Sequence, residues 1–131
     1  MRILRLAERD TEVSDPNTFT GHARITRMTG LSDDPKLNAY RVEFELGART
    51  DWHTHSGTQL LLIISGRCRL QRDGESITEI ADGDVACIAP GERHWHGAGP
   101  DSPMTHLAIN IDSTTTWLEK VADAEYFGGQ R

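Results

Sequence analysis

The stretch that most constrains the fold of this chain is residues 52–59, which read Trp-His-Thr-His-Ser-Gly-Thr-Gln. In a β-strand, side chains two residues apart point to the same face. His53 and His55 would therefore aim two imidazoles at one spot, and Gln59, which has the same parity, would add an amide oxygen. The pattern predicts a strand region that offers nitrogen and oxygen ligands from one face.

A second histidine cluster repeats this arrangement downstream. His94 and His96 are again two residues apart, and His106 adds a fifth imidazole in a strand-like segment, so five of the six histidines fall in these places. Imidazole is the commonest metal-binding side chain, and mixed nitrogen and oxygen ligands suit first-row divalent metals. The clustering favours a metal site over a set of scattered surface histidines.

The rest of the chain has the pattern of an all-β protein. Residues 40–46 alternate strictly between apolar and charged side chains, and short apolar segments elsewhere are separated by glycine and proline turns. This predicts a sandwich or a small barrel, in which the shared face of the strands is the interior and forms a pocket. Further strands are expected at 22–28, 59–65, 68–72, 75–80, 85–89 and 104–111.

The two ends of the chain are expected to differ from the barrel. Residues 1–20 are polar and should form an arm laid on the body or on a second subunit. Residues 114–124 should form a short C-terminal helix, because Thr114 is an N-cap candidate and Trp117 and Val121 would line one helical side.

Length and charge exclude several classes of protein. A chain of 131 residues is expected to form one domain, 1–131, with a real core. The formal net charge of −6 argues against a nucleic-acid partner. The longest apolar run, 60–64, falls far short of the roughly 20 residues of a membrane span, and the N-terminus lacks the apolar region of a signal peptide. We therefore expect a cytoplasmic protein with neither a nucleic-acid nor a membrane partner.

The two histidine clusters resemble the two motifs of the cupin superfamily. The first motif is a glycine, five residues, His-x-His, three or four residues, an acidic residue, six residues and a glycine. The second is a glycine, five residues, Pro-x-Gly, two residues and a histidine. In this chain the first reads Gly47, His53, His55, Gln59 and Gly66, and the second reads Gly83, Ala89-Pro90-Gly91 and His94.

The chain departs from these motifs at three positions. Gln59 replaces the usual glutamate, so the site carries one negative charge fewer. Ala89 stands where the first proline is usual, and Ala98 stands where the second motif usually ends in asparagine. Only the first departure bears on the chemistry of a bound metal.

A narrower similarity covers nearly the whole chain. It is to a group of compact bacterial cupins that includes manganese-dependent (R)-hydroxynitrile lyases and cupins associated with carboxymuconolactone decarboxylases. The segments that carry it are 19–21, 47–50, 52–55, 90–92, 94–98 and 104–109.

The resemblance implies a double-stranded β-helix, the jelly-roll barrel of cupins, with a metal in its mouth. Its ligands would be His53, His55, Gln59 and His94. The cofactor would be a divalent transition metal, most simply Mn²⁺, with Fe²⁺, Zn²⁺ and Ni²⁺ as alternatives. Because all four ligands are neutral, the ion would act as a strong Lewis acid with one or two open positions.

Two further histidines are candidate catalytic residues. His106 and His96 would face the same pocket without binding the metal, and an imidazole titrates near neutral pH, as proton transfer requires. Tyr40 and Val42, on the inward face of an early strand, and Asn110 are expected to line the substrate pocket.

The resemblance favours a metal-dependent lyase of hydroxynitrile-lyase type acting on a small molecule. The metal would polarise a substrate oxygen while His106, with His96, moves the proton. Two alternatives stay open: a metal-dependent dioxygenase or polyketide cyclase, and a non-catalytic cupin that binds a small ligand. The N-terminal arm suggests a homodimer or homotetramer.

Overall fold

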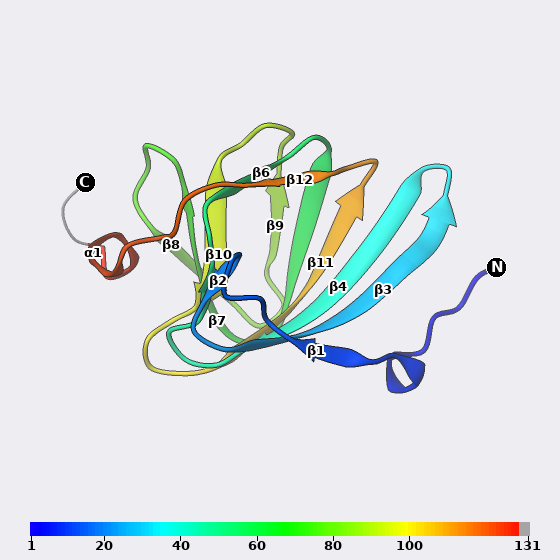
Figure 1. Ribbon diagram of the computed structural model, residues 1–131, viewed down its shortest axis with the longest axis horizontal. Coiled ribbons are helices and arrows are strands. Elements are labelled where there is room, and N and C mark those ends of the chain that lie inside the picture. The colour runs from blue at the N-terminus through cyan, green and yellow to red at the C-terminus, as the bar shows by residue number, and fades with distance from the viewer. Residues whose placement is uncertain (129–131) are drawn as a thin grey trace.

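The computed structural model describes residues 1–128 of the chain, so the last three residues of the predicted domain lie outside the described residues. Its twelve strands form one connected sheet that curls into a half-barrel (Figure 1). The predicted all-β class is confirmed. The strands are β1 (Thr11–Val13), β2 (Phe19–Thr20), β3 (Ala23–Asp33), β4 (Lys36–Phe44), β5 (Arg49–Thr50), β6 (His53–His55), β7 (Thr58–Arg72), β8 (Thr78–Ala81), β9 (Val85–Ile88), β10 (His94–Ala98), β11 (Met104–Ile111) and β12 (Thr115–Trp117), and the helices are the 3-10 turn η1 (Leu6–Glu8) and α1 (Asp123–Tyr126).

The long strand β7 joins the two halves of the curled sheet. Its first half pairs with β11 and β9, whereas its second half pairs with β10 and β8. The sequence suggested that Gly66 ends this strand, but the strand continues through it. Gly66 adopts a φ of +85°, and a Cβ there would lie 2.3 Å from the carbonyl oxygen of Pro103. The glycine therefore allows the close approach of two strands rather than ending one of them.

The core lies on the concave face of the sheet. Burial alternates along β11, with Met104, His106, Ala108 and Asn110 buried and the residues between them half-buried. This period of two residues is what a strand with one covered face produces. A cluster that includes Phe44 and Ile63 packs below the histidines and forms the floor of the interior.

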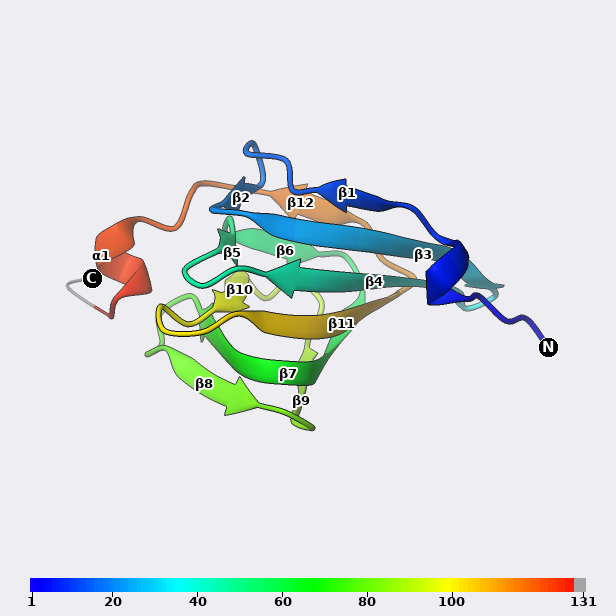
Figure 2. The same ribbon diagram turned by 90° about the horizontal axis from the view of Figure 1, so that it is seen from below.

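The N-terminal arm has two parts. Residues 1–10 extend along the outside of the molecule, where Arg2 donates a hydrogen bond to the Gly30 carbonyl. Beyond them β1 pairs with β3, and β2 pairs with β5. Figure 2 shows β1, β2 and β12 together on one side of the molecule, across from β8 and β9. The second half of the arm is thus part of the barrel wall.

The prediction of a helix at 114–124 is wrong over most of that range. Thr115–Trp117 form strand β12, which pairs antiparallel with β6, and α1 spans only Asp123–Tyr126. A run of β-branched threonines suits a strand, and the free edge of β6 supplies the hydrogen bonds. The helix that follows is docked by Tyr126, whose buried hydroxyl donates to the Ala98 carbonyl at 2.6 Å.

The helices of the described residues span three and four residues, so none of them is long and apolar enough to cross a bilayer.

The contact between β10 and β5 gives a stability prediction. A Cβ at Gly97 would lie 2.3 Å from the Ala48 carbonyl oxygen and 2.6 Å from the Arg49 Cα, so Gly97→Ala must push the two strands apart. We expect it to lower the free energy of unfolding by about 3 kcal/mol. The matched control is Gly99→Ala, where the nearest atom to a new Cβ is Glu79 Oε2 at 3.9 Å. Urea unfolding of both variants tests this, and equal midpoints would contradict it.

Candidate metal centre

The curled sheet encloses a cavity of about 480 Å³ that is lined by eight of the nine predicted site residues. His94 lies behind this group, where it lines a second cavity of about 260 Å³ and packs its ring 4.2 Å from that of His53. The predicted residues that line the main cavity are Tyr40, Val42, His53, His55, Gln59, His96, His106 and Asn110.

Strand pairing brings the histidines together. His94 lies directly opposite His53 in the antiparallel pair of β10 and β6. Three ring nitrogens, one each from His53, His94 and His96, lie within 4.8 Å of one another. The centre of the His55 ring is 4.9 Å from the centre of the His53 ring. Residues more than 40 positions apart in the sequence therefore converge on one point at the wall of the cavity.

Hydrogen bonds at Nδ1 fix the orientation of three imidazoles. Nδ1 of His53 donates to the Asp51 carbonyl at 2.8 Å, and Nδ1 of His94 donates to the Glu92 carbonyl at 2.8 Å. Nδ1 of His55 is hydrogen-bonded to the Thr115 hydroxyl at 2.9 Å. When Nδ1 carries the proton, Nε2 presents its lone pair, which is the arrangement of metal-binding histidines.

Gln59 is oriented in the same way by a neighbour across the sheet. Gln59 and Asn110 are paired residues on β7 and β11, and the Gln59 amide nitrogen donates to Asn110 Oδ1 at 2.8 Å. The Gln59 carbonyl oxygen is left buried, and within the described residues it has no hydrogen-bond partner.

The donor set fits a divalent metal. Within residues 1–128, Nε2 of His55, His94 and His96 and Oε1 of Gln59 are all buried without a hydrogen-bond partner. Buried polar atoms are rarely left unsatisfied, so these unpartnered atoms in and around the histidine cluster point to a cation site. Neutral nitrogen and oxygen donors suit a first-row transition ion better than Mg²⁺ or Ca²⁺.

The electrostatics of the cluster keep the imidazoles neutral. Burial lowers the pKa of His53 well below its usual value, and the adjacent His94 lowers it further. Burial and the same neighbour lower the pKa of His55 to about 4, and burial also lowers the pKa of His94. Neutral imidazoles at pH 7 have lone pairs available for a metal, so the site is ready to bind an ion without first losing protons.

His96 and His106 form a separate hydrogen-bonded pair. Nε2 of His106 and Nδ1 of His96 are 3.0 Å apart, and the edge of Phe44 packs 5.1 Å from the His106 ring. Burial lowers the pKa of His106 to about 4 and that of His96 well below its usual value, with His106 adding to the effect on His96. The pair can pass a proton between its two rings, and both residues line the cavity.

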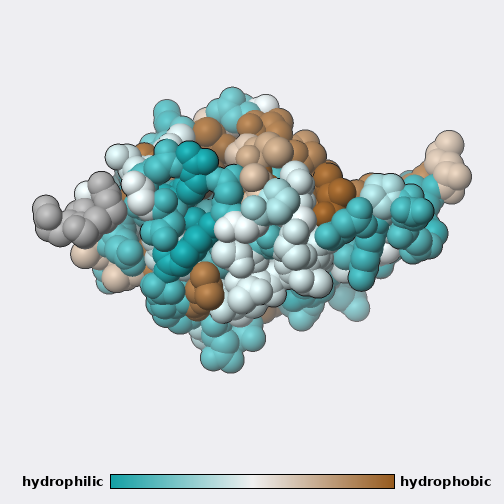
Figure 3. Space-filling model, turned by 90° about the horizontal axis from the view of Figure 1, so that it is seen from above, coloured by the Kyte–Doolittle hydropathy of each residue, from teal (hydrophilic) through white to brown (hydrophobic). Residues whose placement is uncertain are grey.

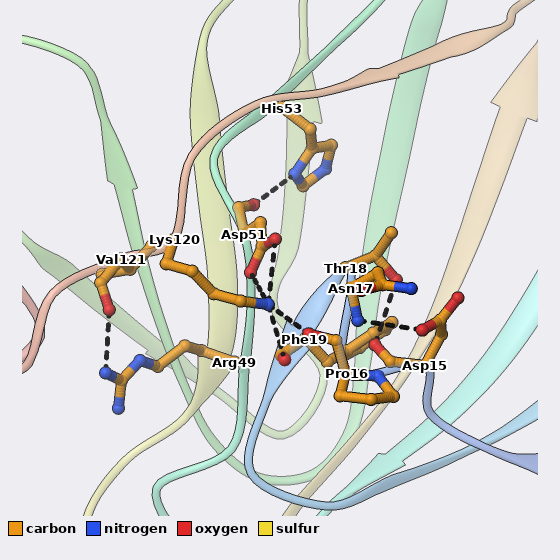
Figure 4. Close-up of polar contacts among 10 residues, drawn as sticks. All are labelled: Asp15, Pro16, Asn17, Thr18, Phe19, Arg49, Asp51, His53, Lys120 and Val121. Atoms are coloured by element: carbon orange, nitrogen blue, oxygen red, sulfur yellow. Dashed lines mark hydrogen bonds and ion pairs between the residues drawn. The ribbon is translucent and has the colours of Figure 1, made fainter.

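An ion pair between the buried Asp51 and the half-exposed Lys120 supports the strand that carries His53 (Figure 4). The Asp51 carboxylate, 2% exposed, accepts hydrogen bonds from Lys120 Nζ at 3.1 and 3.2 Å. The same amine donates to the Phe19 carbonyl at 3.1 Å and to the Pro16 carbonyl. Lys120 thereby ties the N-terminal arm and the C-terminal segment to the residue whose carbonyl holds His53.

Several residues of the site were not predicted from the sequence. Thr115 and Trp117 line the cavity from β12, and the Trp117 ring packs 4.7 Å from that of His53. The β-branched run at 114–116 was the available signal for a strand there. Phe19 and Glu12 line the cavity from the N-terminal arm, and no local pattern marks them.

Comparison with known proteins agrees with this geometry. Residues 40–110 match the model of the family described as Cupin domain. The chain is 40% identical over 129 residues to an (R)-mandelonitrile lyase of Granulicella tundricola, with 96% of this chain and 98% of the relative covered.

Solved structures show the same fold. A cupin-like protein from Thermotoga maritima superposes with a TM-score of 0.85 at 32% identity, covering 94% of this chain and 96% of that one. The polyketide cyclase RemF of Streptomyces resistomycificus gives 0.74 at 16% identity, covering 96% and 90%. A variant of Bacillus subtilis oxalate decarboxylase gives 0.69 at 20% identity, covering 87% of this chain and 31% of that one. With its family match, its close relatives and its curled sheet in agreement, the chain belongs to the cupin family.

Proposed function

We propose that this cupin is a metal-dependent lyase of hydroxynitrile-lyase type, and that His53, His55, Gln59 and His94 hold its divalent metal. The proposal rests on one observation. Neutral side-chain nitrogen and oxygen atoms that have no hydrogen-bond partner in the described residues lie beside a hydrogen-bonded histidine pair. The 40% identical relative is an (R)-mandelonitrile lyase. We further propose Mn²⁺ as the ion.

A bound divalent ion would supply Lewis acidity toward a substrate oxygen. The protein would contribute four neutral ligands, so that no carboxylate among the ligands offsets the ion's charge. The site should therefore favour a substrate whose hydroxyl loses its proton during the reaction.

The His96–His106 pair would move that proton. Both imidazoles are neutral at pH 7 because burial lowers their pKa values, so the pair has a lone pair to accept the proton. The lowered pKa values also make the pair a weaker base than the near-neutral imidazoles that the sequence led us to expect. For a cyanohydrin, the hydroxyl proton goes to the pair, the carbon–oxygen double bond forms, and the bond to the nitrile carbon breaks with its electrons on cyanide. The pair then returns the proton to cyanide, and aldehyde and HCN leave.

The cavity walls suit a small, partly aromatic substrate. Phe19, Tyr40, Val42 and Trp117 line them, and the volume of about 480 Å³ is ample for one aromatic ring with a short side chain. Aromatic walls stack on an aromatic substrate in tilted or offset arrangements. Mandelonitrile is therefore the substrate of choice for a first assay.

Replacing His106 should remove the proton-transfer step. We expect the manganese-loaded His106→Gln variant to cleave mandelonitrile about 10²–10⁴-fold more slowly than the wild type, while its metal content is unchanged. The measurement is release of benzaldehyde, with metal content checked by elemental analysis. His22→Gln is the matched control, because His22 is exposed and lies outside the cluster.

Two results would overturn the proposed function. One is a wild type that binds metal and shows no metal-dependent cleavage, and the other is a His106→Gln variant as active as the His22→Gln control. Oxygen uptake by an iron-loaded wild type with a flavonol or diketone substrate would favour the dioxygenase alternative instead.

We also propose that the chain forms a homodimer or homotetramer. Ile64 on β7 is 47% exposed and Val85 on the adjacent β9 is 59% exposed, and both point outward from the same region of the sheet. Figure 3 shows hydrophobic residues gathered along the upper edge of the molecule, whereas most of the rest of that face is hydrophilic or intermediate. Exposed apolar residues that are grouped in this way are typical of a protein–protein contact.

A further inference from the structure

The strand β12 lies beside the first histidine pair and outside the part of the chain that matches the cupin-domain model, which ends at residue 110. In the antiparallel pairing of β12 with β6, Thr115 lies opposite His55 and Trp117 lies opposite His53. Two consecutive inward-facing residues of this strand therefore contact the two histidines of the His-Thr-His motif.

The imidazoles of His53, His55 and His94 differ in which part of the chain supplies the hydrogen-bond partner of Nδ1. His53 and His94 each use a backbone carbonyl two residues earlier, in the segment that leads into their own strand. His55 uses the side-chain hydroxyl of Thr115, which is 60 residues away in the sequence. The orientation of His55 therefore depends on a distant segment being docked, whereas that of the other two depends on the residues next to them in the chain.

The hydroxyl of Thr115 is able to accept a hydrogen bond from Nδ1 of His55. If Nε2 is to donate its lone pair to a metal, Nδ1 must hold the hydrogen, and the Thr115 oxygen must accept it. Nε2 of His55 is buried without a partner in the described residues, which is the state that this arrangement requires.

Several contacts hold β12 in place. The Trp52 amide donates to the Glu119 carbonyl at 2.9 Å, and the Leu118 amide donates to the Trp52 carbonyl at 2.8 Å. Just beyond, the Lys120–Asp51 ion pair fixes the end of the segment (Figure 4). At the other end, the Ser56 amide donates to the Thr114 carbonyl at 2.9 Å. The segment 114–120 thus lies against the cavity as a clasp that is anchored at both ends of its contact with β6.

We propose that Thr115 is a positioning residue that fixes the tautomer and ring orientation of His55, so that the C-terminal clasp 114–120 completes the metal site. This inference rests on the metal centre of the proposed function. It assigns Thr115 no contact with substrate and no part in proton transfer.

Three variants test the inference. Thr115→Val keeps the side-chain shape and removes the acceptor, Thr115→Ser keeps the hydroxyl, and Thr116→Val makes the same change at the neighbouring exposed position that lies opposite Thr54. The readout is the dissociation constant for Mn²⁺, measured on chelator-stripped protein by competition with a fluorescent chelator and without substrate. Thermal unfolding of each metal-free variant checks that it is folded.

We expect Thr115→Val to weaken Mn²⁺ binding about 10–100-fold, since loss of a hydrogen bond behind a metal-binding histidine has effects of that size. Thr115→Ser should stay within about threefold of the wild type, and Thr116→Val should be unchanged. The inference is overturned if Thr115→Val binds as the wild type does, if serine fails to rescue, or if Thr116→Val is equally impaired.

Failure of the inference and failure of the proposed function can be told apart. A wild type that binds Mn²⁺ tightly but leaves mandelonitrile intact would overturn the lyase assignment, while the affinity pattern of the threonine variants would still support the clasp. A wild type that binds no divalent ion would overturn both.

Discussion

Replacing His94 by alanine is expected to lower the affinity for a divalent metal by about 100-fold. Complete four-ligand zinc sites in peptides contribute about 10–16 kcal/mol, so one ligand accounts for roughly 3 kcal/mol, and each 1.4 kcal/mol is about tenfold in affinity. His94 is well suited to this test because its Nδ1 is already bonded to the Glu92 carbonyl and its Nε2 is buried without a partner in the described residues.

The loss should also appear as a loss of metal-dependent stability. A ligand that binds only the folded state raises the apparent stability by an amount set by its concentration relative to its dissociation constant. The shift in melting temperature on adding Mn²⁺ should therefore shrink in His94→Ala and persist in His22→Ala, which alters an exposed histidine outside the cluster. An unchanged dissociation constant in His94→Ala would show that the ion is held elsewhere.

Strand parity predicted which side chains share a face, because the period of a strand is a local property of the chain. His53 with His55, and His94 with His96, needed no knowledge of the rest of the fold. Parity does not give register, so the sequence contained no sign that His94 would lie directly opposite His53 or that Gln59 would pair with Asn110. These pairings depend on turns and bulges spread along the whole chain.

The segment after residue 113 was predicted wrongly from its local sequence pattern. Thr114 could cap a helix, and Trp117 and Val121 have helical spacing, so a local argument favoured a helix. Pairing with β6 and the ion pair of Lys120 with Asp51 stabilise an extended strand instead. Tertiary contacts here override a weak local preference for a helix. The strand that results places Thr115 where its hydroxyl is hydrogen-bonded to His55.

Gly66 illustrates the same limit. A glycine inside an apolar run is typical of a strand end, yet here it lies within β7. The reason is the Pro103 carbonyl, which approaches so closely that only a residue without a Cβ fits. Gly66 and Pro103 are 37 positions apart in the sequence, so no local pattern could predict their close approach.

The metal-free protein is expected to lose stability steeply as the pH falls from about 6.5 toward 4. The unfolded chain has histidines of ordinary pKa, about 6.5, whereas burial lowers the pKa of both His55 and His106 to about 4. Between these values the unfolded state binds protons that the folded state does not, so the free energy of unfolding decreases as the pH decreases. At about 1.4 kcal/mol per pKa unit, the fully buried His106 alone contributes about 3 kcal/mol, and the lowered pKa values of His53, His94 and His96 act in the same direction.

Urea unfolding in the presence of a chelator, at intervals between pH 7.5 and 4, measures this dependence directly. His106→Gln removes one of the protons taken up on unfolding, so its stability should fall less steeply, by about 1.4 kcal/mol per pH unit in the middle of the range. His22→Gln should follow the wild-type curve, because that side chain is exposed and makes no part of the cluster. A wild-type stability that stays level from pH 6.5 to 4.5, or a His106→Gln slope equal to that of the wild type, would mean that the buried imidazoles are not held neutral by the fold.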